Sequence, residues 1–174
     1  RRAGMSQFIV DLSAPGVTIR PIPILTGKSH FAEVIFDNVE LPEDALIGEV
    51  GNGWQQVLTE LAFERSGPER FMSTFPLLQE LIRIAGESGD DRIRVEVGKL
   101  VARIWTLRQM SLGVAAMLDR GEVPDQVAPL IKDLGTSLEK TITEVIRLLV
   151  PLEGDPETGE RLAVLYSQAV LHAP

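Results

Sequence analysis

A glutamate in the first half of the chain, Glu64, has a side chain that could perform proton-transfer chemistry. Glu64 lies ten residues after Trp54 on a stretch with helical periodicity, and Arg65 follows it directly. At helical spacing Glu64 lies over Val57 and Leu61, so its face of the helix is largely apolar. Burial on such a face raises the pKa of a carboxylate toward the range of a general base. This apolar face is compatible with Glu64 as a base.

A second interpretation of Glu64 stays open, in which it is an ordinary solvated helix residue. It would then pair with Arg65 or with the neighbouring pair at 69–70. Pro68, four residues on, cannot donate a hydrogen bond to the Glu64 carbonyl, so we expect the helix to loosen there. Trp54 has two interpretations as well, as a core residue or as part of the wall of a substrate site.

Composition excludes several other chemistries. The 174 residues include no cysteine, which excludes disulfides, thiolate metal ligands and a cysteine nucleophile, and favours a reducing, cytoplasmic location. His30 and His172 are the only imidazoles, so we expect no metal site. A net charge of −8, without a basic run, disfavours nucleic acid as a partner. No apolar run reaches membrane-spanning length, and Gly51 and Gly53 lack the third glycine of a dinucleotide fingerprint.

The candidate residues lie where a region of strands gives way to a region of helices. Alternating β-rich segments predict strands over residues 6–12, 17–22 and 31–36. Three strands alone leave one face of a sheet uncovered, so we expect further chain or a partner to cover it. Past Val50 the apolar residues recur at helical spacing, and Asp90 is a predicted N-cap. We expect helices from about Gly53 to Ser66 and over about 68–86, 91–119, 124–150 and 157–171.

The junction between the two regions carries the most specific motif. Residues 39–54 read Val-Glu-Leu-Pro-Glu-Asp-Ala-Leu-Ile-Gly-Glu-Val-Gly-Asn-Gly-Trp. This segment resembles the acyl-CoA dehydrogenase family, in which a strand ends in V-x-V-P-x-x-x-L-(I)-G and G-x-G-[FW] opens the first helix of the C-terminal bundle. Residues 8–11 and 15–17 are similar to the F-(I/V)-V and P-G-(V/I) segments of the family's hairpin. The resemblance is specific over residues 5–70, and beyond them it rests on helix number and length.

The resemblance implies a fold. Family members have an N-terminal helical domain, a middle β-domain and a C-terminal four-helix bundle. Residues 1–46 then correspond to the end of the middle β-domain, and residues 47–174 correspond to the C-terminal helical-bundle domain. The expected fold class is mainly α, an up-and-down four-helix bundle preceded by a partial antiparallel β-domain, and we expect the chain to be the second half of a longer protein.

The resemblance also implies an activity, the FAD-dependent oxidation of an acyl-CoA thioester to the α,β-enoyl-CoA. In the family, a glutamate removes the α-proton while a hydride passes to the flavin. A minority of members carry this glutamate ten residues after the aromatic of G-x-G-[FW], with an arginine next, which matches Glu64 and Arg65. Arg65 and Trp54 are then expected at the acyl-CoA site. The family also implies FAD as cofactor, electron-transferring flavoprotein as electron acceptor, and a homo- or hetero-oligomer formed through the bundle.

Two segments depart from the family pattern. An R-x-x-F-G segment is expected at the turn that residues 85–92 occupy, where the chain reads Ala-Gly-Glu-Ser-Gly-Asp-Asp-Arg. A Q-x-x-G-G segment is expected where residues 146–151 read Ile-Arg-Leu-Leu-Val-Pro. Both family segments belong to the flavin nucleotide site, so we expect that this chain alone does not hold FAD. The same loss supports an alternative function, a non-catalytic scaffold or assembly subunit of an acyl-CoA dehydrogenase-like hetero-oligomer.

Overall fold

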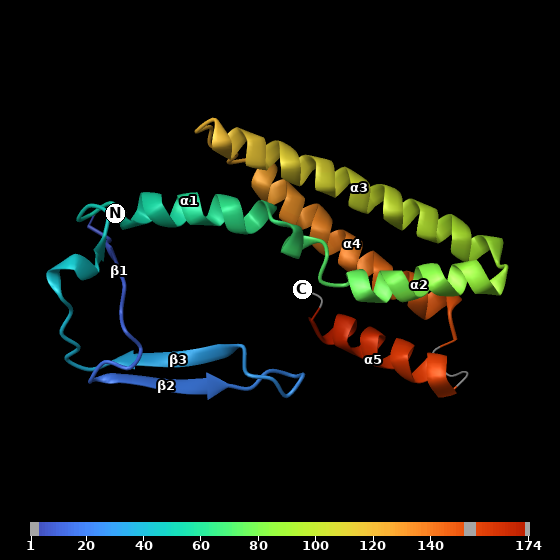
Figure 1. The fold of residues 1–174 in the computed structure, drawn as a ribbon, viewed down its shortest axis with the longest axis horizontal. Helices are drawn as coiled ribbons and strands as arrows, with labels where there is room; N and C mark the ends of the chain where they lie inside the picture. Colours follow the sequence, from blue (N-terminus) through green and yellow to red (C-terminus); the bar gives the residue numbers. More distant parts are fainter. Residues whose placement is uncertain (1–3, 152–155, 173–174) are drawn as a thin grey trace. The chain divides into compact units, whose positions relative to one another are not determined.

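The computed structural model describes residues 4–151 and 156–172 of the chain. The chain forms two compact units, one over Arg1–Leu61 and one over Ala62–Pro174. Figure 1 shows the strands of the first unit and the helices of the second. The boundary predicted between residues 46 and 47 was one between domains of a longer protein, which these two units do not test. It stays a prediction.

The first unit contains two small antiparallel sheets. Strands β2 (Val17–Ile22) and β3 (Phe31–Phe36) form a hairpin in which Val17 is paired with Phe36, which confirms both predicted strands. Strand β1 (Gln7–Phe8) pairs with β4 (Leu46–Ile47), which follows the short 3₁₀ helix η1 (Glu43–Ala45). The prediction of a strand over 6–12 is wrong in length. Because β4 offers only two residues, pairing past Phe8 is limited to one hydrogen bond from Ile9 N–H to the Ala45 carbonyl, at 2.8 Å.

Two glycines lead the chain into the first helix, α1 (Gly53–Ser66). Gly51 has a φ of +86°, a conformation that side chains with a Cβ rarely adopt. A Cβ on Gly53 would lie 2.9 Å from the Met5 carbonyl oxygen, and the Gly53 N–H donates to that same oxygen at 2.8 Å. These two glycines therefore let the chain turn into the helix beside Met5.

The second unit is built on four helices that pack on one another. They are α2 (Phe75–Ser88), α3 (Asp91–Asp119), α4 (Val127–Leu149) and α5 (Pro156–His172). In Figure 1, α4 runs between α3 and α5, and α2 contacts α3, α4 and α5. A helical bundle preceded by a partial antiparallel β-region confirms the predicted fold class.

Two predicted helix starts are wrong, and each falls at a proline that is followed by a turn before the helix begins. The predicted helix from residue 68 is a 3₁₀ turn, η2 (Pro68–Arg70), followed by α2 from Phe75 with Pro76 in its first turn, where a missing N–H is tolerated. Helix α4 begins at Val127 rather than near residue 124. Pro124 precedes a turn in which the Asp125 N–H donates to the Val123 carbonyl, at 3.0 Å, and the helix starts after it.

The core of the bundle follows a seven-residue repeat along α3. Ile93, Leu100, Leu107 and Val114 are at most 5% exposed and lie seven residues apart, which is the periodicity of a helix packed along its length on a neighbouring helix. The facing side chains of α4 are fully buried: Ile131, Leu138, Ile142 and Ile146. Three apolar residues that recur at helical spacing on α3 and α4 are exposed instead, Val101 at 45%, Leu130 at 46% and Leu134 at 38%, and each lies next to a buried residue of the packed seam.

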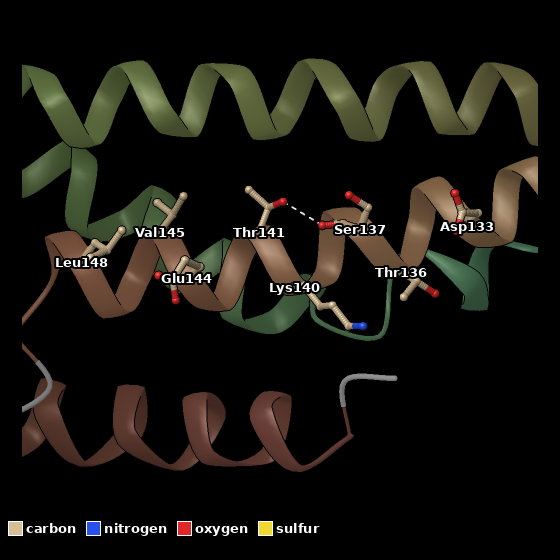
Figure 2. A pocket seen from close by; sticks show the side chains of 8 residues that line it. All are labelled: Asp133, Thr136, Ser137, Lys140, Thr141, Glu144, Val145 and Leu148. Carbon is tan, nitrogen blue, oxygen red and sulfur yellow. Dashed lines mark hydrogen bonds between the residues drawn. The ribbon is translucent and has the colours of Figure 1, made fainter.

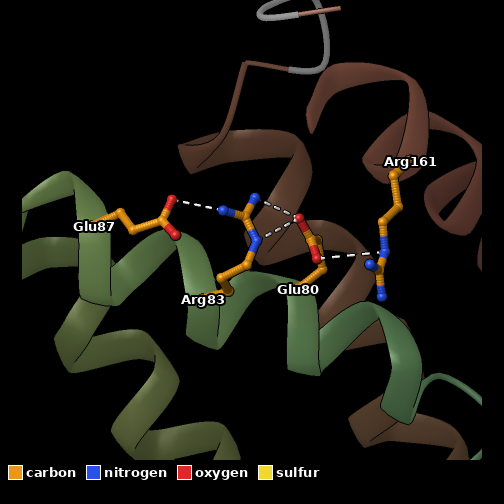
Figure 3. A network of polar contacts seen from close by, with 4 residues as sticks. All are labelled: Glu80, Arg83, Glu87 and Arg161. Carbon is orange, nitrogen blue, oxygen red and sulfur yellow. Dashed lines mark hydrogen bonds and ion pairs between the residues drawn. The ribbon is translucent and has the colours of Figure 1, made fainter. Parts of the chain in front are cut away.

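Charged side chains fix the ends and the edges of the bundle. The predicted N-cap is confirmed, because Asp90 Oδ1 accepts a hydrogen bond from the Arg92 N–H at 2.8 Å. Glu80 of α2 is 4% exposed and pairs with Arg83 at 2.6 Å and with Arg161 of α5 at 3.7 Å (Figure 3). The hydrogen bonds that Arg83 donates raise the pKa of its guanidinium, and the one to Glu80 has a larger effect than the one to Glu87. This network joins α5 to α2.

Candidate functional site

The three predicted site residues all lie on α1. Trp54 is half-buried near the start of the helix, while Glu64 and Arg65 form its last turn. The Glu64 side chain is 45% exposed and forms an ion pair with Arg70, so it does not have the apolar surroundings that its spacing predicted. The reason is local. The helix ends two residues later, and the following turn brings a guanidinium to the carboxylate.

The end of α1 is completed by donors from outside the helix. Because Pro68 has no N–H, the Glu64 carbonyl lacks its regular helical partner, and Arg70 Nε donates to it at 2.9 Å. The same guanidinium pairs with the Glu64 carboxylate. Ser111 Oγ of α3 donates to the Ser66 carbonyl at 2.6 Å. The last turn of α1 is therefore held by α3 and by the turn that follows it.

A cavity of about 450 Å³ adjoins this helix end. Its lining comes from the end of α1 with the start of the turn, and from the C-terminal half of α3, and is mainly apolar with polar atoms at its margin: Phe63, Ser66, Gly67, Pro68, Ser111, Ala115, Leu118 and Asp119. Arg65, beside it, is half-buried and has no ion pair within the described part of the chain. Glu64 and Arg65 are not part of this lining, but they lie between two residues that are, Phe63 and Ser66.

Another hollow, of about 500 Å³, lies along α4 and includes none of the predicted residues (Figure 2). One helix supplies its lining, with opposite charges alternating at Asp133, Lys140 and Glu144. Thr141 Oγ1 donates to the Ser137 carbonyl at 2.7 Å, so part of the polar surface of this hollow already has a hydrogen-bond partner. We assign the candidate site to the end of α1 for these reasons.

In the ranges 4–151 and 156–172, no three His, Asp or Glu side chains gather as metal ligands, and no helix is long and apolar enough to cross a bilayer. His30 lies in an exposed segment, and the His172 side chain is outside the described residues.

The connection between α2 and α3 does not fit a flavin nucleotide. Arg92 is paired with Asp90, at 2.8 Å, and Arg94 with Asp91, at 3.3 Å, and hydrogen bonds from Arg92 lower the pKa of Asp90. These cations are therefore engaged by acidic neighbours, and the connection adds negative charge where a diphosphate would need positive charge.

Comparisons with known proteins agree with this fold. No protein-family profile matches the chain. The acyl-CoA dehydrogenase IpdE1 of Mycolicibacterium smegmatis is 33% identical over 136 residues, which are 75% of this chain and 34% of IpdE1. Butyryl-CoA dehydrogenase of Megasphaera elsdenii has a similar structure, with a TM-score of 0.77 at 16% identity over 99% of this chain and 49% of that one. The steroid ACAD Tcur3481-Tcur3483 gives a TM-score of 0.75 at 20% identity, over 98% and 47%.

The fold is thus that of the C-terminal half of acyl-CoA dehydrogenases. The chain belongs to the acyl-CoA dehydrogenase family. It spans between 21% and 46% of the length of the four mycobacterial acyl-CoA dehydrogenases that it matches.

The sequence did not point to every residue that shapes this helix end. Arg70 appeared only as an alternative partner of Glu64, although the proline at i+4 leaves a carbonyl that a following arginine can satisfy. Ser73 and Glu139 are 66 residues apart, and their hydrogen bonds follow only from the packing of the turn on α4. No local sequence pattern predicts such a contact.

Proposed function

We propose that the protein to which this chain belongs is an FAD-dependent acyl-CoA dehydrogenase that oxidises an acyl-CoA thioester to its enoyl-CoA, with Glu64 as the base. The observation that carries the proposal is the last turn of α1, where Glu64, ten residues after Trp54, is followed by Arg65 beside an apolar cavity. Membership of the acyl-CoA dehydrogenase family supports the reaction class.

In this proposal the residues of the chain have separate tasks. Glu64 accepts the α-proton of the thioester, and its ion pair with Arg70 holds the carboxylate at the end of α1. Arg65 binds an anionic part of acyl-CoA, and Trp54 contributes to the wall of the site. FAD, when bound, supplies the acceptor of the hydride that leaves the β-carbon.

The cofactor and partners are proposed on the same basis. FAD is held by parts of the full-length protein outside this chain or by a partner subunit, since the 85–92 connection does not fit it. Electron-transferring flavoprotein is the proposed acceptor and the cytoplasm the proposed location. We also propose a hetero-oligomer formed through the bundle. A full-length protein that purifies as a homotetramer with one flavin per chain would contradict the mixed assembly.

The acyl group follows from a weaker observation. Tcur3481-Tcur3483, a structure of similar fold, is described as a steroid ACAD. Together with the apolar cavity at the end of α1, this favours a bulky apolar acyl group over a short polar one. A panel of acyl-CoA thioesters of increasing bulk tests this preference through their kcat/KM values.

A second function is supported by a specific observation. The Glu64 carboxylate is exposed and paired with Arg70, as an ordinary surface glutamate would be, and the flavin segments are replaced. A non-catalytic scaffold subunit would have these properties.

One experiment separates the two functions. The full-length protein is purified with its natural partners, and acyl-CoA oxidation is measured for the unchanged protein and for Glu64→Gln. The enzyme proposal predicts a fall in kcat of about 10²- to 10⁴-fold, the usual contribution of a general base. Activity that survives Glu64→Gln undiminished, or an unchanged protein without activity in any assembly, would favour the scaffold.

A further inference from the structure

The turn between α1 and α2 is anchored on α4 at several points. The Phe71 side chain is 1% exposed and belongs to the core of the bundle. Next to it, Gly135 of α4 lies directly against the turn, because a Cβ at this glycine would be 2.2 Å from the Arg70 carbonyl oxygen. The backbone of the turn can therefore approach α4 this closely only where α4 has no side chain.

One turn further along α4, Glu139 makes a third anchor. Its side chain is 3% exposed, and it accepts two hydrogen bonds from Ser73, from the N–H at 2.9 Å and from Oγ at 2.5 Å. A buried carboxylate is unfavourable unless donors compensate for its lost hydration. Here both donors that the described residues provide come from Ser73, so Glu139 fixes the position of a single residue of the turn.

The anchored turn reaches back to the candidate base through Arg70. Its guanidinium donates from Nε to the Glu64 carbonyl, at 2.9 Å, and pairs with the Glu64 carboxylate. Arg70 thus contacts both the backbone and the side chain of Glu64. Any displacement of the turn moves the group that holds Glu64 in place.

We propose that Glu139, which touches neither Glu64 nor the cavity lining, is a positioning residue for Glu64. Together with Gly135 it fixes the turn on α4, the turn fixes Arg70, and Arg70 fixes the orientation of the Glu64 carboxylate. This inference rests on the proposed function, because the contact of Glu139 with the turn can affect the reaction only if Glu64 is the base. It gives a role in the reaction to a residue of α4 that lies 75 positions after Glu64 in the sequence.

The test compares two buried glutamates in the full-length protein in its natural assembly. Glu139→Ala removes the anchor of the turn. Glu80→Ala is the matched control, since Glu80 is equally buried at 4% but joins α2 to α5 through Arg83 and Arg161. Glu139→Gln is the conservative variant, because its amide oxygen can still accept both hydrogen bonds from Ser73.

Glu139→Ala is expected to lower kcat by about 10²-fold with KM changed by less than about 3-fold, since a displacement near 1 Å has an effect of this size on a reacting group. Glu139→Gln should recover most of the loss, and Glu80→Ala should leave kcat within about 3-fold of the unchanged protein. Hydrogen exchange of peptides that cover 64–74 should be faster in Glu139→Ala alone. Arg70→Gln should lower kcat similarly, and the double variant should lose little more, because both act through one contact.

The outcomes separate the inference from the proposed function. If Glu64→Gln abolishes turnover while Glu139→Ala and Glu80→Ala lose the same small amount, the base is right and the positioning role is wrong. Additive losses for Arg70→Gln and Glu139→Ala would overturn it too. If the unchanged protein has no turnover, the proposed function fails and the positioning role fails with it.

Discussion

The two compact units of the chain differ in how they bury their apolar residues. Of the apolar side chains described in residues 4–61, only Ala45 is buried, while Phe31 of the hairpin is 66% exposed and Phe36 is 56% exposed. In the second unit, Leu78, Leu138 and Ile142 have no exposed area. The helical unit makes its own core, whereas the strands present apolar faces that the hairpin alone cannot cover. Stability and the support of the candidate site should therefore both come from the helices.

The largest expected contrast is in the response to side-chain truncation. Leu138→Ala should lower the free energy of unfolding by about 2–5 kcal/mol, because it leaves a cavity among fully buried side chains. Phe36→Ala, in the exposed hairpin, should change it by less than about 1 kcal/mol. Urea unfolding followed by helical circular dichroism measures both. Equal losses would contradict the difference between the two units.

A smaller contrast is expected between two glycines inside the helical unit. Gly135→Ala should destabilise the fold by about 1–3 kcal/mol, because the new Cβ would overlap the Arg70 carbonyl and push the turn away from α4. Gly98 of α3 is the control, since nothing lies within 4 Å of a Cβ there. Gly98→Ala should stabilise the helix by up to about 1 kcal/mol. A Gly135→Ala protein as stable as the unchanged one would show that the turn is not held against α4.

The smallest effect concerns the pH dependence of the helical unit. Hydrogen bonds from Arg92 lower the pKa of Asp90 below its ordinary value of 3.8. A carboxyl whose folded pKa is lowered stabilises the fold above its unfolded pKa, and this contribution is lost as the pH falls through the folded value. Asp90→Ala should therefore have an unfolding midpoint that changes less between neutral and acidic pH.

Asp133, on the exposed side of α4, serves as the control for this measurement. Asp133→Ala should leave the acid dependence of the midpoint as it is in the unchanged protein, because Asp133 is exposed and lies within α4 rather than at a helix start. An Asp90→Ala protein with the same acid dependence as the unchanged one would contradict the role of the N-cap.

Periodicity and caps were sufficient to predict much of the helical unit. Helix α3 has the predicted bounds because Asp90 caps its start and its apolar repeat continues for its whole length. The strand over 6–12 was overestimated because β-propensity does not tell how many residues a partner strand offers. The start of α2 was misplaced because the turn after Pro68 is shaped by Gly135 and Glu139, which are distant in the sequence.

The candidate site, too, could be predicted from the sequence only in part. The position of Glu64 on a helix, with Arg65 next to it, followed from local spacing. Its partner Arg70 and the remote anchor on α4 did not, because they depend on the packing of a turn against a helix. Local patterns can thus mark a candidate base, but the side-chain contacts around it come from the tertiary structure.

Exchange of the α-proton tests the assignment of Glu64 most directly. The full-length protein in its natural assembly is incubated with an acyl-CoA deuterated at the α-carbon, and loss of deuterium to water is followed with and without Glu64→Gln. Glu69→Gln is the control, because Glu69 lies in the exposed η2 turn. We predict that Glu64→Gln slows the exchange by about 10²- to 10⁴-fold and that Glu69→Gln leaves it nearly unchanged. Exchange in Glu64→Gln at the rate of the unchanged protein would show that another group removes the proton.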